Sequence, residues 1–153
     1  MRQGDSLFWS YSLRFYDDRK TQKTCLDAQD RLGADVNLIL FCLFKAQAGH
    51  CLNLNALKKA NTNVISWRTD VIQPLRQIRK NLKGQPHNLP DNDQAAIRKT
   101  VNNLELRAEK FQQQYLETLE LESQAAEPKQ AAKDNLAAYF QILGANISDP
   151  VFI

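Results

Sequence analysis

The chain has 153 residues, of which 43% are hydrophobic and 24% are charged, with only five glycines and five prolines. This composition excludes a disordered chain, a collagen-like repeat and a low-complexity linker, and the length predicts a single domain over residues 1–153, which the helical patterns described below make a helical one. Twenty Lys and Arg against seventeen Asp and Glu leave a formal net charge of +3, so no strong field commits the molecule to nucleic acid or to an anionic membrane.

Cysteine usage and the length of the apolar runs indicate a cytoplasmic protein that is not embedded in a membrane. The three cysteines, Cys25, Cys42 and Cys51, cannot all pair within one chain, and none stands in a C-x-x-C arrangement. A reducing compartment fits this pattern best. The longest apolar run, 38–44, is far shorter than the roughly 20 residues that span a bilayer. We therefore expect no membrane partner and no glycosylation at the sequon of Asn146.

The first third of the chain predicts three short helices. A segment at about 5–18 carries aromatic residues at helical spacing, and a second at about 21–32 is closed by Gly33. Asp35 can cap a third helix that is apolar nearly all round, which is typical of a central, buried helix. A short apolar run is also compatible with a buried strand, but no alternating segment elsewhere would pair with it, so helix is favoured.

The rest of the chain predicts two long helices and a shorter last one. The first long helix covers 53–83, where Pro74 is expected to produce a kink and the run 61–63 is a second weak point. Residues 84–90 are expected to form the loop before the second long helix, at about 91–125. A last helix should start at Pro128 and end at Gly144, and the tail 146–153 is expected to be extended.

The predicted fold is all-α: short N-terminal helices packed on two long antiparallel helices, plus a C-terminal helix. The 91–125 segment carries apolar residues at alternating spacings of four and three, which is the pattern of a coiled coil. We call these residues the heptad seam, and they are either buried within the monomer or form an interface with a partner. The heptad seam consists of Ile97, Val101, Leu104, Ala108, Phe111, Tyr115 and Leu119.

Signatures of catalysis and of metal binding are missing from the sequence. There is no Gly-rich phosphate loop, no G-x-S-x-G and no H-E-x-x-H, so we predict no catalytic residue and no cofactor. The neighbours His50 and Cys51 could supply two metal ligands, but the paired short spacings of a zinc site are absent and no metal is predicted. The carboxylates of Asp27 and Asp30 share a helix face, and a solvated charged surface explains them better than a magnesium site.

One face of the 53–83 helix is purely basic, and it is the most specific binding feature of the sequence. This basic face could bind the phosphates of RNA or DNA, or an acidic protein surface. Alternatively, the Glu-rich flank of the 91–125 helix packs alongside and neutralises it. The second reading is favoured, because no aromatic residue lies between the basic positions as a stacking platform for bases would require. The basic face consists of Arg68, Arg76, Arg79, Lys80 and Lys83.

Several polar residues lie among apolar neighbours and form a candidate pocket. A buried polar group must find a hydrogen-bond partner, and a set of such groups that converges between helices can bind a ligand. Helix capping and structural hydrogen bonds are the more common role and are favoured here. The residues of this candidate pocket are Arg14, Asp35, Asn37, Trp67 and Asp70.

Three strings of the sequence resemble a family of small, all-helical, cytoplasmic bacterial proteins of unknown function. They are the string at 33–38, Gly-Ala-Asp-Val-Asn-Leu, the pair Trp67-Arg68, and Pro-Leu-Arg at 74–76 followed by Arg79. The resemblance covers about residues 5–120. It implies a helical fold and no assigned activity, and it carries no catalytic residues over to this chain.

The sequence therefore favours a protein that acts by binding. The leading hypothesis is a protein–protein interaction or regulatory module that uses the long helices, with a protein partner or self-association. Binding of nucleic acid or of a phosphate ligand through the basic face is the alternative. An enzyme with a pocket around Asp35, Asn37 and Arg68 is the third hypothesis.

Overall fold

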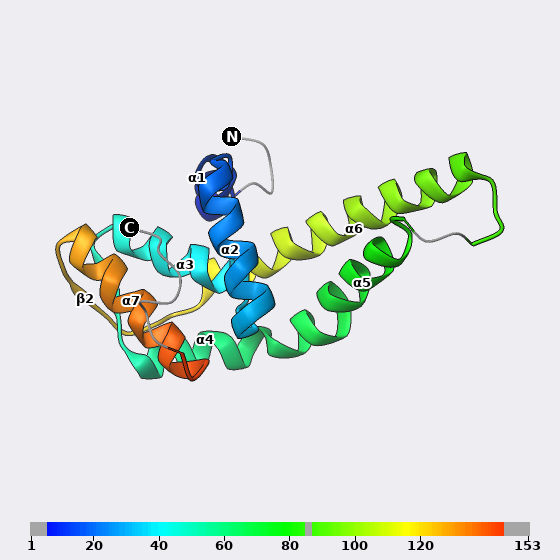
Figure 1. The fold of residues 1–153 in the computed structure, drawn as a ribbon. Helices are drawn as coiled ribbons and strands as arrows, with labels where there is room; N and C mark the ends of the chain where they lie inside the picture. The colour runs from blue at the N-terminus through cyan, green and yellow to red at the C-terminus, as the bar shows by residue number, and fades with distance from the viewer. Residues whose placement is uncertain (1–5, 85–86, 146–153) are drawn as a thin grey trace. The chain divides into compact units, whose positions relative to one another are not determined.

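A computed structural model of the chain describes residues 6–84 and 87–145, and the predicted extended tail 146–153 lies outside these residues. The described chain is 77% helical with one small two-stranded sheet, which confirms the all-α prediction (Figure 1). It divides into two compact units. The core unit is Met1–Asn63 with Gln113–Ile153, and the hairpin unit is Val64–Gln112. Whether the two make one domain stays a prediction.

The core unit is built from helices whose ends are fixed by polar caps. Asp18 accepts a hydrogen bond from the backbone N–H of Thr21, and Asp35 accepts one from the N–H of Asn37, so each satisfies a donor that the first helical turn leaves free. Gly33 ends the second helix at φ 68°, a conformation that glycine adopts without strain. The elements of this unit are α1 (Leu7–Phe15), α2 (Arg19–Leu32), α3 (Val36–Gln47), β1 (His50–Leu52), the first part of α4 (Leu54–Trp67), the end of α6 (Asp91–Thr118), β2 (Ser123–Ala125) and α7 (Pro128–Ile142).

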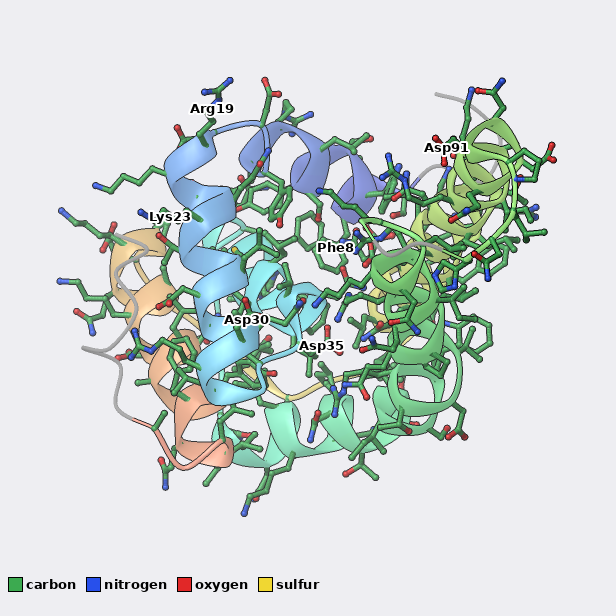
Figure 2. All side chains as sticks on the ribbon, turned by 45° about the vertical axis from the view of Figure 1, so that its right-hand side comes forward. Phe8, Arg19, Lys23, Asp30, Asp35 and Asp91 are labelled. Carbon is green, nitrogen blue, oxygen red and sulfur yellow. The ribbon has the colours of Figure 1, made fainter. Side chains whose placement is uncertain are left out.

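Helix α3 is the centre of the core unit, as its apolar sequence predicts. Leu38, Ile39 and Phe41 are fully buried, and α7 packs along α3 with buried aromatic residues of its own. Phe8 of α1 stacks on Phe44 of α3 with ring centroids 5.0 Å apart, and Figure 2 shows Phe8 in the interior of the core unit. The charged side chains of α2, such as Lys23, lie on its outer surface. The amphipathic pattern of the first helices predicts their packing only in part, because Leu7 of α1 is 69% exposed and Leu26 of α2 is 45% exposed.

A short antiparallel sheet corrects the sequence prediction at the end of the second long helix. The helix expected to run to about 125 ends at Thr118, and β2 pairs with β1 so that Leu52 lies opposite Ser123. The backbone N–H of Ala126 also donates to the carbonyl oxygen of Gly49, at 2.9 Å. Strands of three residues carry no alternating pattern, so only the tertiary partner makes these segments extended.

The first long helix changes its winding near Arg68, and this corrects the predicted kink at Pro74. Residues Arg68–Ile72 form one π-helical turn, η1, and α5 follows as Gln73–Asn81. Pro74 sits in the first turn of α5, where a missing N–H costs little. The run 61–63 stays helical. The helix is thus irregular because one extra residue is inserted in the turn before Pro74, and the helix is not interrupted at the proline itself.

The three cysteines are free thiols in different surroundings, which predicts different reactivities. Burial raises the pKa of the Cys25 thiol to about 12, and it also raises the pKa of the fully buried Cys42 thiol. Cys51 is half-buried in β1, so it remains the most accessible of the three. A water-soluble disulfide reagent at about pH 8 should therefore label one thiol quickly in the native protein and the other two only on unfolding. Cys51→Ser should remove the fast phase, and two fast thiols would contradict the prediction.

Within residues 6–84 and 87–145, no helix is both long enough and apolar enough to cross a membrane.

Candidate functional site

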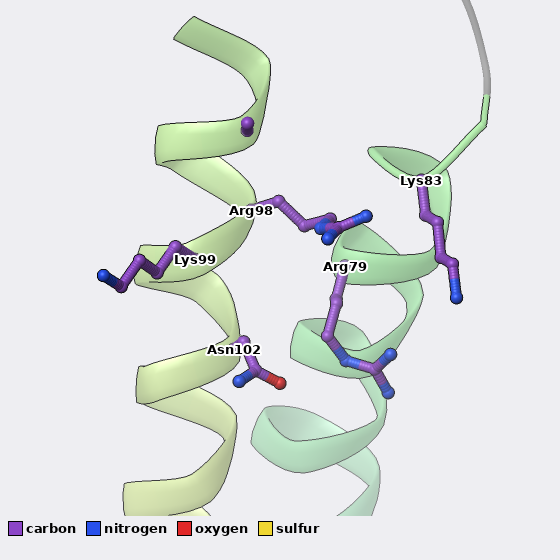
Figure 3. A pocket seen from close by; sticks show the side chains of 6 residues that line it. Arg79, Lys83, Arg98, Lys99 and Asn102 are labelled. Carbon is purple, nitrogen blue, oxygen red and sulfur yellow. The ribbon is translucent and has the colours of Figure 1, made fainter. Parts of the chain in front are cut away.

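The hairpin unit places α5 alongside α6, and ion pairs join the two helices. Arg79 Nε lies 2.6 Å from Glu105 Oε2, and Arg76 Nε lies 3.4 Å from Glu105 Oε1. A second carboxylate, Glu109, lies 3.3 Å from Arg76 Nη2. Figure 3 shows the two helices side by side. The Glu-rich flank of α6 therefore neutralises part of the basic face, as the favoured reading of the sequence predicts.

Glu105 is buried at this helix contact, with 5% of the residue exposed. Its hydrogen bonds to Arg79, together with its negative charge, raise the pKa of that guanidinium above its usual value. Hydrogen bonds between ionised groups are stronger than those between neutral ones, and here they join residues far apart in the sequence. The two helices of the hairpin are thus joined by a charged contact.

The heptad seam is largely exposed in the hairpin unit, so most of it is not buried within this unit. Ile97 is 49% exposed, Leu104 is 45% exposed and Phe111 is 49% exposed. Ala108 is the only member of the heptad seam that the structure describes as buried. At ~100° per residue, Leu104 lies about 100° around α6 from Glu105, so contact through Glu105 leaves the seam at the side of the hairpin.

The apolar stripe of α5 reaches the same side of the hairpin. The two helices are antiparallel and meet at Arg79 and Glu105. At ~100° per residue, residues that lie about 40–120° to one side of these contact points therefore share one side of the helix pair. Trp67 lies across this side, and its Nε1 donates to the carbonyl oxygen of Ala108 at 2.9 Å. We call the combined surface the apolar face. It consists of Trp67, Val71, Leu75, Ile78, Leu82, Ile97, Val101, Leu104 and Phe111.

The opposite side of the hairpin holds a pocket of about 440 Å³ that we call the basic pocket. Two residues of the predicted basic face line it, Arg79 and Lys83. Sequence analysis missed the others, because it treated each helix alone and the pocket needs both. A helical wheel of 91–118 aligned on the contact with α5 would have found them. These further lining residues are Ala95, Arg98, Lys99 and Asn102 of α6.

Three residues of the predicted basic face do not line this pocket: Arg68, Arg76 and Lys80. Arg68 is half-buried in η1, and Lys80 is exposed on α5. Arg76 and Arg79 are paired with Glu105, so the residues of the predicted basic face do not form one continuous binding surface.

The residues of the candidate pocket predicted from polar positions are divided between the two units. In the core unit, Asn37 is buried and its Oδ1 accepts a hydrogen bond from Gln113 Nε2 at 2.9 Å, while Asp35 caps α3. Arg14 is exposed on α1. Trp67 and Asp70 belong to the hairpin unit, where both are exposed. Asp35, Asn37 and Trp67 all make hydrogen bonds that hold helices in place, which is the structural role that the sequence favours.

No cluster of three or more His, Cys, Asp or Glu side chains in the described part of the chain is arranged to hold a metal ion.

A family model described as protein of unknown function (DUF2390) matches residues 7–116, which include the whole hairpin unit. No curated protein and no protein of solved structure matches the chain.

Proposed function

This chain belongs to the family of proteins of unknown function DUF2390, and we propose that it acts by binding, through the apolar face of the hairpin unit. The occupant that we propose for this face is a second copy of the chain, which would make the protein a dimer joined through α5 and α6. The observation that carries the proposal is the exposure of the apolar face.

The hairpin unit buries little apolar surface of its own. Among the described residues of this unit, three apolar side chains are buried: Val64, Ile72 and Ala108. The large side chains that it leaves exposed on the apolar face are Trp67, Ile78, Ile97, Leu104 and Phe111. A two-helix unit gains most of its stability from burying such a face, and the hairpin unit by itself does not cover this one.

The exposed area fits the requirement of a dimer. The five exposed side chains are 37–49% accessible and together present on the order of 400 Å² of surface. A standard interface buries about 800 Å² per partner, of which about 56–65% is apolar. The apolar face therefore supplies most of the apolar area that one partner of a stable dimer contributes.

The charges at the edge of the apolar face are self-complementary. Asp93 and Arg107 lie on the outer edge of α6, about 21 Å apart at ~1.5 Å per residue. A two-fold axis near Thr100 with the two α6 helices antiparallel brings Asp93 of one copy to Arg107 of the other, twice in each dimer. On the α5 edge, Pro74 and Asn81 carry no charge. These four positions bring no like charges together when the face pairs with itself, and the two opposite pairs support the pairing.

Sedimentation velocity over micromolar concentrations tests the proposal. The wild-type chain should form dimers, and Leu104→Glu should weaken the dimer at least about tenfold, because it places a carboxylate in the apolar contact. Helical content should be unchanged, since Leu104 is 45% exposed. Phe111→Glu should act in the same direction.

Leu26→Glu is the matched control, since Leu26 is also 45% exposed but lies on α2 in the core unit. It should leave the dimer unchanged. A wild-type chain that stays monomeric throughout the concentration range, or a dimer that Leu26→Glu and Leu104→Glu weaken equally, would overturn the proposal.

The proposed setting is the bacterial cytoplasm. Three free thiols support a reducing compartment, and a formal net charge of only +3 does not oppose association of two copies.

A further inference from the structure

We propose that the basic pocket binds the diphosphate group of a small phosphorylated ligand. The pocket lies between α5 and α6 and has a volume of about 440 Å³, within the range of small-molecule sites. Figure 3 shows Arg98 reaching from α6 toward α5, where Arg79 and Lys83 lie, with Asn102 between the two helices; the Lys99 side chain extends from α6 on the side away from α5. The pocket lies on the opposite side of the hairpin from the apolar face, so this inference does not rest on the proposed dimer.

The pocket holds positive charge that the protein itself does not compensate. Arg79 is paired with Glu105. Among the residues that the structure describes, no carboxylate lies within ion-pair distance of Lys83, Arg98 or Lys99, and no acidic residue lines the pocket. Cations held close together repel one another unless an anion lies between them. The pocket is therefore a site where an anion lowers the energy of the folded protein.

The number and type of these groups match a diphosphate better than a single phosphate. Three uncompensated cations correspond to the roughly three negative charges of a diphosphate, whereas a phosphate monoester carries ~1.5–2. Arg98 can donate two parallel hydrogen bonds to phosphate oxygens, and the Asn102 amide adds a neutral donor. Lysine contributes a point charge without fixed geometry, which suits Lys83 and Lys99 at the sides of the group.

The lining also favours a small ligand over single-stranded nucleic acid. Binding of a single strand combines basic residues with aromatic side chains on which bases stack. The lining residues are Arg79, Lys83, Ala95, Arg98, Lys99 and Asn102, and they include no aromatic ring. The pocket therefore binds phosphate groups and offers no aromatic side chain on which the rest of the ligand could stack.

Isothermal titration calorimetry of the full chain with inorganic pyrophosphate, ADP and inorganic phosphate tests this inference at low salt. Pyrophosphate and ADP should bind, and inorganic phosphate should bind at least about tenfold more weakly. Equal affinity for pyrophosphate and ADP identifies the diphosphate as the recognised group, while tighter binding of ADP identifies a nucleotide as the source of that group. Arg98→Gln and Lys83→Gln should each weaken pyrophosphate binding about tenfold or more.

Lys80→Gln is the matched control, because Lys80 is an exposed lysine of α5 that does not line the pocket. It should leave pyrophosphate binding unchanged, and all three variants should keep the wild-type dimer content and melting temperature. The inference fails if wild-type protein does not bind pyrophosphate, or if Lys80→Gln weakens binding as much as Lys83→Gln. It also fails if a DNA duplex binds more tightly than pyrophosphate and loses affinity equally in every variant, which would indicate a diffuse nucleic-acid surface.

Discussion

Asn135→Ala should lower the free energy of unfolding by about 3–5 kcal/mol, because one buried amide holds three parts of the core unit together. Asn135 Oδ1 accepts a hydrogen bond from the backbone N–H of Leu52 at 2.7 Å. Its Nδ2 donates to the carbonyl oxygens of Cys42 at 3.0 Å and of His50 at 3.1 Å. The substitution leaves these backbone groups of α3 and β1 without partners in the interior, and each unsatisfied group costs about 1–3 kcal/mol.

Urea unfolding of the two proteins measures this loss, and hydrogen exchange locates it. The amide of Leu52 should exchange slowly in the wild-type chain and much faster in Asn135→Ala. Gln141→Ala is a suitable control, since Gln141 is an exposed amide of the same helix, α7, and its loss should cost under about 0.5 kcal/mol. If Asn135→Ala lowered the free energy of unfolding by less than about 1 kcal/mol, the hydrogen bonds of the Asn135 side chain would not be a principal contribution to the stability of the core unit.

The core unit shows which parts of a fold are readable from local pattern. Helix α3 was predictable because seven of its apolar residues are buried and apolar residues follow one another along most of the segment. The caps at Asp35 and Gly33 were also predictable, since their conformation depends only on neighbours in the chain. The pairing of β1 with β2 was not, because it depends on Asn135 and on backbone groups distant in the sequence.

The hairpin unit shows a second limit, which concerns the direction that a helix face takes. The heptad seam is real as a pattern, yet it does not mark the contact between α5 and α6. That contact is made by Glu105 and by Arg76 and Arg79, residues that a hydrophobic pattern assigns to the solvent. Charge on facing helices was visible in the sequence, and the favoured reading of the basic face used it. The residues that complete the basic pocket, such as Arg98, required the register between the helices.

Glu105→Ala should destabilise the hairpin unit by about 2–4 kcal/mol, because it removes the carboxylate that compensates both Arg76 and Arg79. The side chains of these arginines are only 20% and 29% exposed, so neither is fully solvated when its partner is lost. Glu109→Ala should cost less, since Glu109 Oε1 lies 3.3 Å from Arg76 Nη2 and the Glu109 side chain is 26% exposed, against 7% for Glu105. Hydrogen exchange should localise the loss of protection from Glu105→Ala to residues 64–112.

A triple variant separates the loss of an ion pair from the loss of packing volume at this contact. Arg76→Met, Arg79→Met and Glu105→Leu together replace the charges by apolar side chains of similar length, and buried ion networks replaced in this way often keep or gain stability. We therefore expect the free energy of unfolding of the triple variant to exceed that of Glu105→Ala by about 2 kcal/mol, because no uncompensated guanidinium remains. If Glu105→Ala and the triple variant were equally unstable, shape at the helix contact and not charge compensation would hold α5 against α6.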